Sequence, residues 1–190
     1  VSRIQTLRSR GVSLSDTAVF YRTNAQSRLF EEALRREGIP YVVIGGVRFY
    51  ERKEIKDILA YLNVVVNRDD REALLRIINV PARGVGDVGI ARLEAWAASR
   101  GMRFSDALAH AGEVAGLRAA PALVKLARLF DDWRRRHAAG ESPADLVETV
   151  IDESGYLDSL RREASPESES RVENLLEFLG SVRQYKDAAG

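Results

Sequence analysis

The sequence predicts an α/β segment with part of a parallel sheet, followed by an all-α domain. Two short apolar runs, residues 17–20 and 41–44, flank an amphipathic stretch at 24–37, and no strand signal follows residue 66. Uninterrupted apolar runs are typical of strands covered on both faces, and two of them joined by a helix predict a parallel pair with a right-handed crossover. We therefore expect a domain boundary at an acidic turn after residue 66, between an α/β part (1–66) and a helical domain (67–190).

The composition is that of an ordinary globular protein, with 45% apolar and 30% charged residues in 190. Because the net charge is only +1, a nucleic-acid surface would have to come from local clustering of arginines. There is no cysteine, which excludes disulfides and thiolate metal sites and is compatible with the cytosol. No apolar run approaches the ~20 residues of a membrane span, and no signal peptide is evident. We expect a cytoplasmic protein with no membrane partner.

Helical periodicity and end signals place the remaining elements. Gly11 ends a helix at 2–10, and Asn24 and Gly38 cap the helix at 24–37. A helix at 53–66 has a broad apolar face. Ser142 and Pro143 mark a helix start, whereas the polar run at 165–169 is expected to be a linker. Further helices are expected at 70–79, 87–99, 104–111, 120–138, 142–154, 156–164 and 170–186.

The first candidate site is the pair Tyr21 and Arg22, which follows the first predicted strand. Open α/β sheets bind ligands at the carboxyl ends of their strands. A tyrosine ring can stack on a nucleobase, and a guanidinium matches phosphate oxygens. The pattern also fits a packed ring beside a surface cation, and the residues alone leave both interpretations open.

A second candidate begins at Gly45 and Gly46, which allow a ligand to approach the backbone closely. Arginines and aromatic residues alternate directly after them, namely Arg48, Phe49, Tyr50 and Arg52. Such interleaving is typical of single-strand binding surfaces, because rings stack on bases and guanidinium groups neutralise phosphates. The alternative is that the two rings pack this turn onto the following helix.

A third candidate lies between two predicted helices, at Arg83, Gly84, Val85 and Gly86, with Asp87 as a helix cap. A glycine-apolar-glycine turn between two helices is the helix-hairpin-helix arrangement. In it, the backbone amides of the turn and the N-terminus of the second helix face a phosphate. Such contacts do not depend on base identity and suit any duplex. The same pattern is also compatible with a plain helix-helix turn.

Three motifs together resemble the UvrD/PcrA/Rep family of superfamily 1A DNA helicases: YRTNAQSR at 21–28, GGVRFYERKEIKD at 45–57 and RGVGD at 83–87. The resemblance covers essentially the whole chain, and the first two motifs are specific. It implies the start of the second RecA-like domain (2A, 1–66) and the inserted helical accessory domain (2B, 67–190). Asn63 departs from the arginine expected at its position, and Val85 replaces the usual isoleucine.

The resemblance also implies roles for these residues. Tyr21 would pack on the adenine of ATP, and Arg22 would be the catalytic residue that reaches the γ-phosphate. Gly45, Gly46, Arg48, Phe49 and Arg52 would lie beside the single-stranded DNA track. The loop at 83–86 would grip duplex DNA. Gln26 and Arg28 are expected to be structural.

Other features of an ATPase are absent from this sequence. It has no G-x-x-x-x-G-K-[ST] phosphate loop and no acidic box for magnesium, and His110 and His137 lack metal-ligand spacing. The chain also begins at Val1 without an initiator methionine. We therefore expect a piece of a larger ATP-dependent 3′ to 5′ helicase in DNA repair or replication, inactive as an ATPase alone. ATP and Mg²⁺ would bind the full protein, where the first RecA-like domain supplies the metal ligands.

Two other functions remain open. One is a non-enzymatic module that binds duplex DNA through the loop at 83–86. The other is a helical regulatory domain that binds proteins, such as repair factors, since accessory domains in this family can restrain unwinding.

Overall fold

The structure is a computed structural model that describes residues 1–44 and 46–189, with side chains as far as residue 184. Its internal contacts divide the chain into two compact units, Val1–Arg52 (unit 1) and Lys53–Gly190 (unit 2). The helix at 53–66 thus groups with unit 2, whereas the sequence placed the boundary after it. The reason is its apolar face, which packs against helices of unit 2.

Unit 1 is built around one amphipathic helix, α2 (Ser27–Arg36). A single 3₁₀ turn, η2 (Asn24–Gln26), precedes it, so the predicted helix at 24–37 begins as 3₁₀ and continues as α. Gly38, with φ of +64°, ends α2 as predicted, and the Ile39 N–H donates to the Leu34 carbonyl at 2.9 Å. The remaining elements are α1 (Ser2–Ser9), η1 (Leu14–Asp16) and η3 (Phe49–Glu51).

The two predicted strands, 17–20 and 41–44, are not shown by the structure, which has no strand in residues 1–44 or 46–189. Thr17 and Thr23 have extended backbones, but no backbone hydrogen bond joins the two segments in this part of the chain. Their large apolar side chains are uncovered, with Phe20 92% and Ile44 89% exposed. A strand needs a neighbour for its N–H and C=O groups, and local sequence does not supply one.

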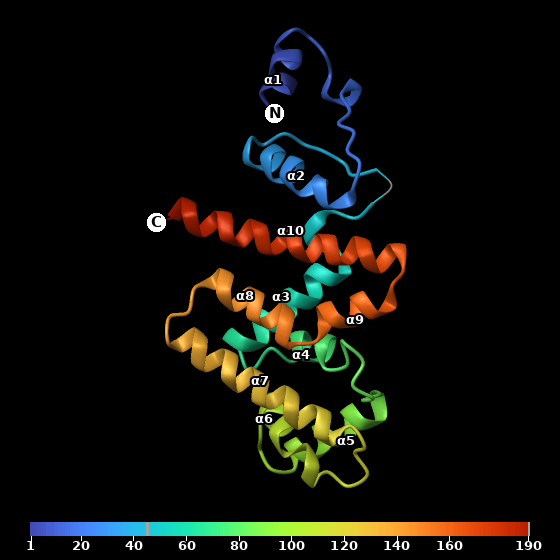
Figure 1. The fold of residues 1–190 in the computed structure, drawn as a ribbon, viewed down its shortest axis with the longest axis vertical. Coiled ribbons are helices and arrows are strands. Elements are labelled where there is room, and N and C mark those ends of the chain that lie inside the picture. Colours follow the sequence, from blue (N-terminus) through green and yellow to red (C-terminus); the bar gives the residue numbers. More distant parts are fainter. Residues whose placement is uncertain (45, 190) are drawn as a thin grey trace. The chain divides into compact units, whose positions relative to one another are not determined.

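Unit 2 is all helical in its described residues, and α3 (Lys53–Val66) lies at its centre (Figure 1). Ile55, Ile58, Tyr61 and Val64 of α3 are fully buried. They pack where α3 meets α4, α7, α8 and α10. The other elements are α4 (Arg71–Ile77), α5 (Asp87–Ala98), α6 (Phe104–Ala107), η4 (Leu108–Glu113), α7 (Ala120–Ala138), α8 (Pro143–Glu153), α9 (Tyr156–Glu163) and α10 (Pro166–Ala189).

Aromatic packing and buried polar bonds hold α3 in place. The Tyr61 ring contacts Phe130 and Trp133 of α7 at centroid distances of 6.1 and 6.0 Å. Asp57, also buried, accepts from Arg76 Nε of α4 at 2.8 Å and from the Tyr156 hydroxyl of α9 at 2.9 Å. Burial and the nearby Asp57 carboxylate raise the pKa of Tyr156, so its hydroxyl stays protonated and donates.

The helices of unit 2 follow the sequence prediction closely, with two exceptions: the predicted linker at 165–169, and the predicted helix at 104–111, which is the short helix α6 followed by the 3₁₀ helix η4. α3 and α7 have the predicted limits, and Ser142 caps α8 by accepting from the Asp145 N–H at 3.2 Å. The predicted linker at 165–169 is instead the start of α10, which lies beside α8 and α9 (Figure 1). Ser165 and Ser168 cap it reciprocally, each accepting from the other's N–H at 3.1 and 3.0 Å.

Within the part of the chain that the structure describes, no helix combines the length and apolarity needed to cross a membrane.

Candidate nucleotide and nucleic-acid interfaces

The backbone at Arg22 is fixed while its side chain is exposed. The Gln26 side-chain oxygen accepts from the N–H groups of Arg22 and Thr23, at 2.9 and 3.3 Å. In the described residues the Arg22 guanidinium has no hydrogen-bond or ion-pair partner. A cation held on a fixed backbone with uncommitted donors can bind an anionic group from outside unit 1.

Tyr21 is half-buried and lies on an aromatic side chain of α2. Its ring is nearly parallel to that of Phe30, at a centroid distance of 6.3 Å and an interplanar angle of 17°. Phe30 is itself 40% exposed, and Phe20 next to Tyr21 is almost fully exposed. Tyr21 and Arg22 therefore present a ring and a cation together at one end of α2.

A buried glutamate of α2 organises the rest of unit 1. Glu31 is 4% exposed and accepts from the Ser27 hydroxyl at 2.7 Å, the Phe49 N–H at 3.2 Å and the Tyr41 hydroxyl at 3.2 Å. Because the carboxylate is satisfied from three segments, it joins the residues around 41 and 49 to α2. Sequence reasoning missed Glu31, although an acid on the apolar side of an amphipathic helix was a detectable signal.

Two predicted single-strand contacts, Arg52 and Phe49, face the interior of unit 1. Arg52 is 8% exposed and Phe49 1% exposed. The Arg52 guanidinium donates to the Asn24 carbonyl at 2.8 Å, the Ser27 hydroxyl at 2.7 Å and the Val47 carbonyl at 3.3 Å, and lies 5.1 Å from the Phe49 ring centroid. Arg52 could contact DNA only by giving up these hydrogen bonds within unit 1 for bonds to the nucleic acid.

The other residues of this motif lie nearer the surface. Arg48 is exposed, with a long ion pair of 3.8 Å to Glu51 and a position 5.8 Å from the Tyr41 ring centroid. Gly46 is exposed, whereas Gly45 lies outside the described residues. Tyr50 is half-buried and its hydroxyl donates to Glu32 at 2.9 Å. Arg48 and Gly46 are thus the described members of the motif that a polynucleotide can reach directly.

Arg83 is turned into unit 2. Its Nη1 donates to the carbonyls of Ile77 at 2.9 Å, Val80 at 3.0 Å, and Ile78 and Pro81 at 3.3 Å. These carbonyls lie at and just beyond the end of α4, where helices leave acceptors unsatisfied. Nη2 donates to the Tyr61 hydroxyl at 2.5 Å and to the Ser154 carbonyl at 3.3 Å. Arg83 therefore braces the loop from inside.

Tyr61 and Asn79, which the sequence analysis did not single out, hold the same loop. The Tyr61 hydroxyl donates to the Val80 carbonyl. Burial raises the pKa of Tyr61, and the Arg83 charge opposes this only in part. The Asn79 side-chain oxygen accepts from the Arg83 N–H at 2.7 Å and the Val85 N–H at 3.4 Å.

The tip of the loop is a turn of two exposed glycines around a buried valine. Gly84 has φ of +73°, which favours glycine, and Val85 is 2% exposed. Gly86, and not Asp87 as predicted, is the N-cap of α5, which has no side-chain cap; Asp87 is the first residue of the helix. Two glycines, a helix N-terminus and a braced backbone form a surface on which amides can approach a phosphate.

A separate open cavity of about 210 Å³ lies between α6, η4 and α7. Arg68 and Arg134 line it together with Asp106 and Asp131, and these four side chains pair with one another at 3.2 to 3.8 Å. Burial and the neighbouring Arg68 lower the pKa of Arg134. None of the predicted site residues lines this cavity.

Comparison with known proteins defines the class of protein to which these features belong. Residues 1–116 match the model of the UvrD-like helicase C-terminal domain. The chain is 42% identical over 178 residues to ATP-dependent DNA helicase UvrD1 of Mycobacterium tuberculosis, covering 92% of this chain and 23% of the relative. It is 40% identical over 186 residues to ATP-dependent DNA helicase PcrA of Bacillus subtilis, covering 97% and 25%.

A more distant relative is a probable DNA helicase II homolog of Rickettsia conorii, 34% identical over 183 residues, covering 95% of this chain and 28% of the relative. The chain thus spans about a quarter of the length of these curated relatives. It belongs to the UvrD-like helicase family, as the three sequence motifs predicted.

Proposed function

We propose that this chain is part of an ATP-dependent DNA helicase, in which residues 1–66 begin the second RecA-like domain and 67–190 form the inserted accessory domain. Family membership supports the proposal, and so does the share of the relatives that the chain spans. The α/β character of the first part would depend on further strands that pair with 17–20 and 41–44. ATP and Mg²⁺ would bind the complete protein, with the phosphate loop and metal ligands on the first RecA-like domain.

The observation that carries this proposal is the uncommitted guanidinium of Arg22. Its backbone is held by Gln26, and its donors have no partner in the described residues. A cation in this state can offset the charge that spreads over the phosphoryl oxygens in the transition state. Because the first RecA-like domain would bring the nucleotide, Arg22 would meet the γ-phosphate only when the two domains close, which couples hydrolysis to movement on DNA.

The neighbouring side chains fit the same function. Tyr21 would stack on adenine with its outer face while Phe30 supports the other. Arg48 and Gly46, being exposed, would line the single-stranded DNA track, with Gly45 beside them. Phe49 and Arg52 would support that surface from behind.

The finer assignments follow from the family. They are translocation with 3′ to 5′ polarity, a role in DNA repair or plasmid replication, and a location in the cytoplasm. Protein partners would include repair factors as well as the first RecA-like domain.

The test is ATP turnover by the complete protein with Arg22→Ala. Removing a cation of this kind costs about 10³-fold or more in kcat. DNA binding should be largely preserved, because the Arg22 side chain has no hydrogen-bond or ion-pair partner in the described part of unit 1. Arg10→Ala, which removes another exposed arginine of unit 1, serves as the control and should leave turnover unchanged. Unchanged turnover in Arg22→Ala would remove Arg22 from the site.

A second function, favoured by the braced loop at 83–86, is binding of duplex DNA by unit 2. Its backbone amides would contact phosphates whatever the sequence, with a steep salt dependence. Gly84→Ala should weaken duplex binding, because φ of +73° strains any side chain. Gly101→Ala is a matched control, since Gly101 also has positive φ (+61°) and open space around its Cα. Equal effects of both substitutions would count against the loop.

A further inference from the structure

Residues 114–130 form the longest stretch of unit 2 whose sequence contains basic residues but no aspartate or glutamate. This stretch contains Arg118, Lys125 and Arg128 but no aspartate or glutamate, although the chain has 28 acidic residues. Arg118 precedes α7, and Lys125 and Arg128 lie on it. In the described part of the chain none of the three has an ion-pair partner.

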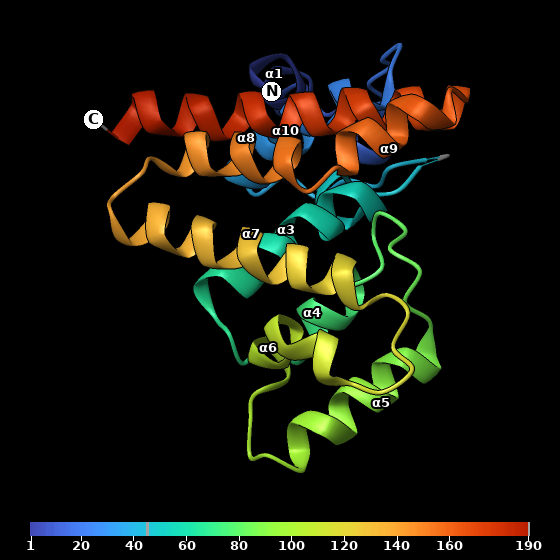
Figure 2. The same cartoon turned by 60° about the horizontal axis from the view of Figure 1, so that its bottom comes forward.

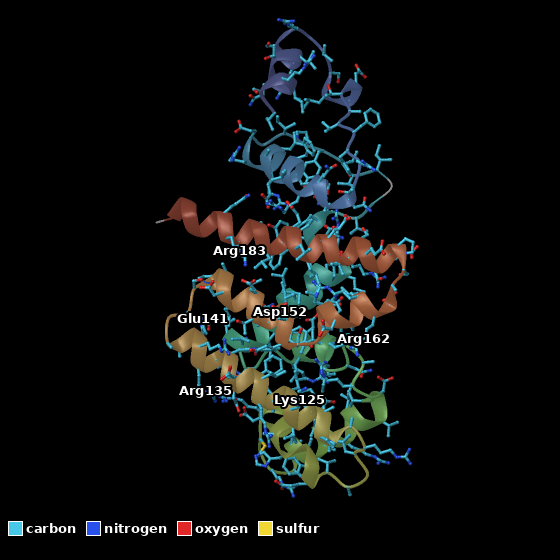
Figure 3. All side chains as sticks on the ribbon, in the orientation of Figure 1. Lys125, Arg135, Glu141, Asp152, Arg162 and Arg183 are labelled. Carbon is cyan, nitrogen blue, oxygen red and sulfur yellow. The ribbon has the colours of Figure 1, made fainter. Side chains whose placement is uncertain are left out.

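All three residues are exposed, and Lys125 and Arg128 lie on the side of α7 away from its buried residues Leu123, Leu126 and Phe130. The C-terminal part of α7 differs, because Arg135 and Arg136 pair with Asp132 at 2.9 and 2.8 Å. Lys125 and Arg135 are labelled on this helix in Figure 3. The uncompensated charge is therefore confined to the first half of α7 and the loop before it.

The loop that carries Arg118 lies next to α5, which begins directly after the loop at 83–86. Arg92 of α5 donates to the Gly116 carbonyl at 3.3 Å, and a Cβ on Gly89 would lie only 3.1 Å from Leu117. The loop before α7 therefore packs on the first turns of α5, as Figure 2 shows. We define the α7 cationic surface as Arg92, Arg118, Lys125 and Arg128.

We propose that the α7 cationic surface binds the phosphate backbone of duplex DNA beside the stretch held by the loop at 83–86. The proposal rests on the proposed duplex binding by unit 2 and adds a second group of contacts to it. The rise of a helix separates Lys125 from Arg128 by about 4.5 Å along its axis, and successive phosphates of one strand lie about 3.4 Å apart along the duplex axis. Their long side chains can reach neighbouring phosphates.

Nucleic acid fits this surface better than an acidic protein does. Protein interfaces depend on apolar and aromatic anchors at their centres. None of the exposed large apolar residues of the chain falls within 114–130. Val88, one turn before Arg92 on α5, is 69% exposed, but residues 114–130 offer charge without an exposed large apolar anchor, and charge is what contact with a phosphate backbone requires.

The experiment measures binding of this chain to a blunt duplex over a range of salt concentrations. The test variant carries Arg118→Gln, Lys125→Gln and Arg128→Gln. The control carries Arg3→Gln, Arg8→Gln and Arg10→Gln, which remove three exposed arginines of unit 1 and change the net charge equally. If three phosphate contacts are lost, the fall in affinity between 50 and 200 mM salt should be about 40-fold smaller in the test variant than in the original chain.

The control variant should keep the salt dependence of the original chain. If both variants weaken binding equally, the effect comes from the net charge of the chain and not from this surface, which would overturn the proposal. A surface that binds a polyglutamate peptide but not the duplex would belong to an acidic protein partner, which also overturns it. If Gly84→Ala weakens duplex binding and the test variant does not, the duplex binding proposed for unit 2 is supported, whereas the α7 cationic surface is excluded as a DNA contact. If the chain binds no duplex at all, both the duplex binding proposed for unit 2 and the role of the α7 cationic surface are excluded.

Discussion

The Arg22 segment and the Arg83 loop use the same local device and differ in what the guanidinium does. In each, a side-chain amide oxygen four residues away accepts from the arginine N–H, Gln26 at 2.9 Å and Asn79 at 2.7 Å. Arg22 then projects without a partner among the described residues, whereas Arg83 donates to five carbonyls and to Tyr61. The difference lies in the surroundings, because carbonyls at and beyond the end of α4 face Arg83.

An arginine in a functional motif can therefore act by contact or by support. Arg83 holds the backbone that the proposed duplex contact needs, so its loss would weaken DNA binding without any direct contact to a phosphate. Arg52 resembles Arg83 in this respect, since it is buried and bonds three segments of unit 1. Stability measurements distinguish the two roles.

The largest effect on stability is expected for Arg83→Ala. It leaves buried carbonyls without donors and should lower the free energy of unfolding of unit 2 by about 3 kcal/mol. Urea denaturation followed by tryptophan fluorescence reports on this unit, because Trp96 and Trp133 both lie in it. Arg92→Ala is the control, since Arg92 is exposed and bonds one carbonyl. Comparable midpoints for the two variants would show that Arg83 does not brace the loop.

Tyr61→Phe should have an intermediate effect. The substitution keeps the ring against Phe130 and Trp133 but removes the hydroxyl that bonds Val80 and Arg83. We expect a loss of about 1.5 kcal/mol and faster proteolysis of the loop at 83–86. A variant as stable as the original chain would mean that Arg83 holds the loop without Tyr61.

The two amides provide a matched pair. Gln26→Ala and Asn79→Ala should each cost about 1 kcal/mol, because each frees two backbone N–H groups. Hydrogen exchange should accelerate at Arg22 and Thr23 in the first variant and at Arg83 and Val85 in the second. If hydrogen exchange accelerates in only one of the two variants, the side-chain amide does not fix the arginine backbone in the same way at Arg22 and Arg83.

The smallest effect concerns alkaline pH. The pKa of Tyr61 is raised in the folded chain, so the folded state keeps a proton that the unfolded state releases above a pH of about 10. The stability that the protonated Tyr61 hydroxyl contributes is fully present below a pH of about 10, and it is lost as the pH rises toward the pKa of Tyr61 in the folded state. Tyr61→Phe should therefore show a shallower loss of stability above pH 10, measured by urea denaturation at several pH values. An identical slope would exclude Tyr61 as a source of the dependence.

The sequence predicted the helices of unit 2 well because their signals are local. Ser142 and Pro143 start α8, Gly155 separates α8 from α9, and apolar periodicity places α3 and α7. The start of α10 was missed although Ser165 and Pro166 are the same kind of signal as Ser142 and Pro143. The strands at 17–20 and 41–44 were not predictable to the same degree, because pairing depends on distant segments.

The residues of the candidate sites stay predictions, and the burial of their side chains was only partly predictable from the sequence. The prediction that Gln26 and Arg28 are structural agrees with the structure, in which Gln26 fixes the Arg22 backbone and Arg28, 3% exposed, pairs with Glu32 at 2.7 Å. The inward orientation of Arg52 and Arg83 could not be predicted, because most of the acceptors that hold them are backbone carbonyls, beside the hydroxyls of Ser27 and Tyr61. Carbonyl positions depend on the tertiary arrangement and carry no residue-type signal.

The stability of Arg22→Ala tests most directly whether the Arg22 guanidinium is without a partner among the described residues. Hydrogen exchange of the α2 amides during urea denaturation reports on unit 1. We expect the free energy of unfolding of Arg22→Ala to lie within about 0.5 kcal/mol of that of the original chain, as for an ordinary surface substitution. A loss comparable to that of Arg83→Ala would show that Arg22 supports its own unit and would contradict its proposed role at the nucleotide.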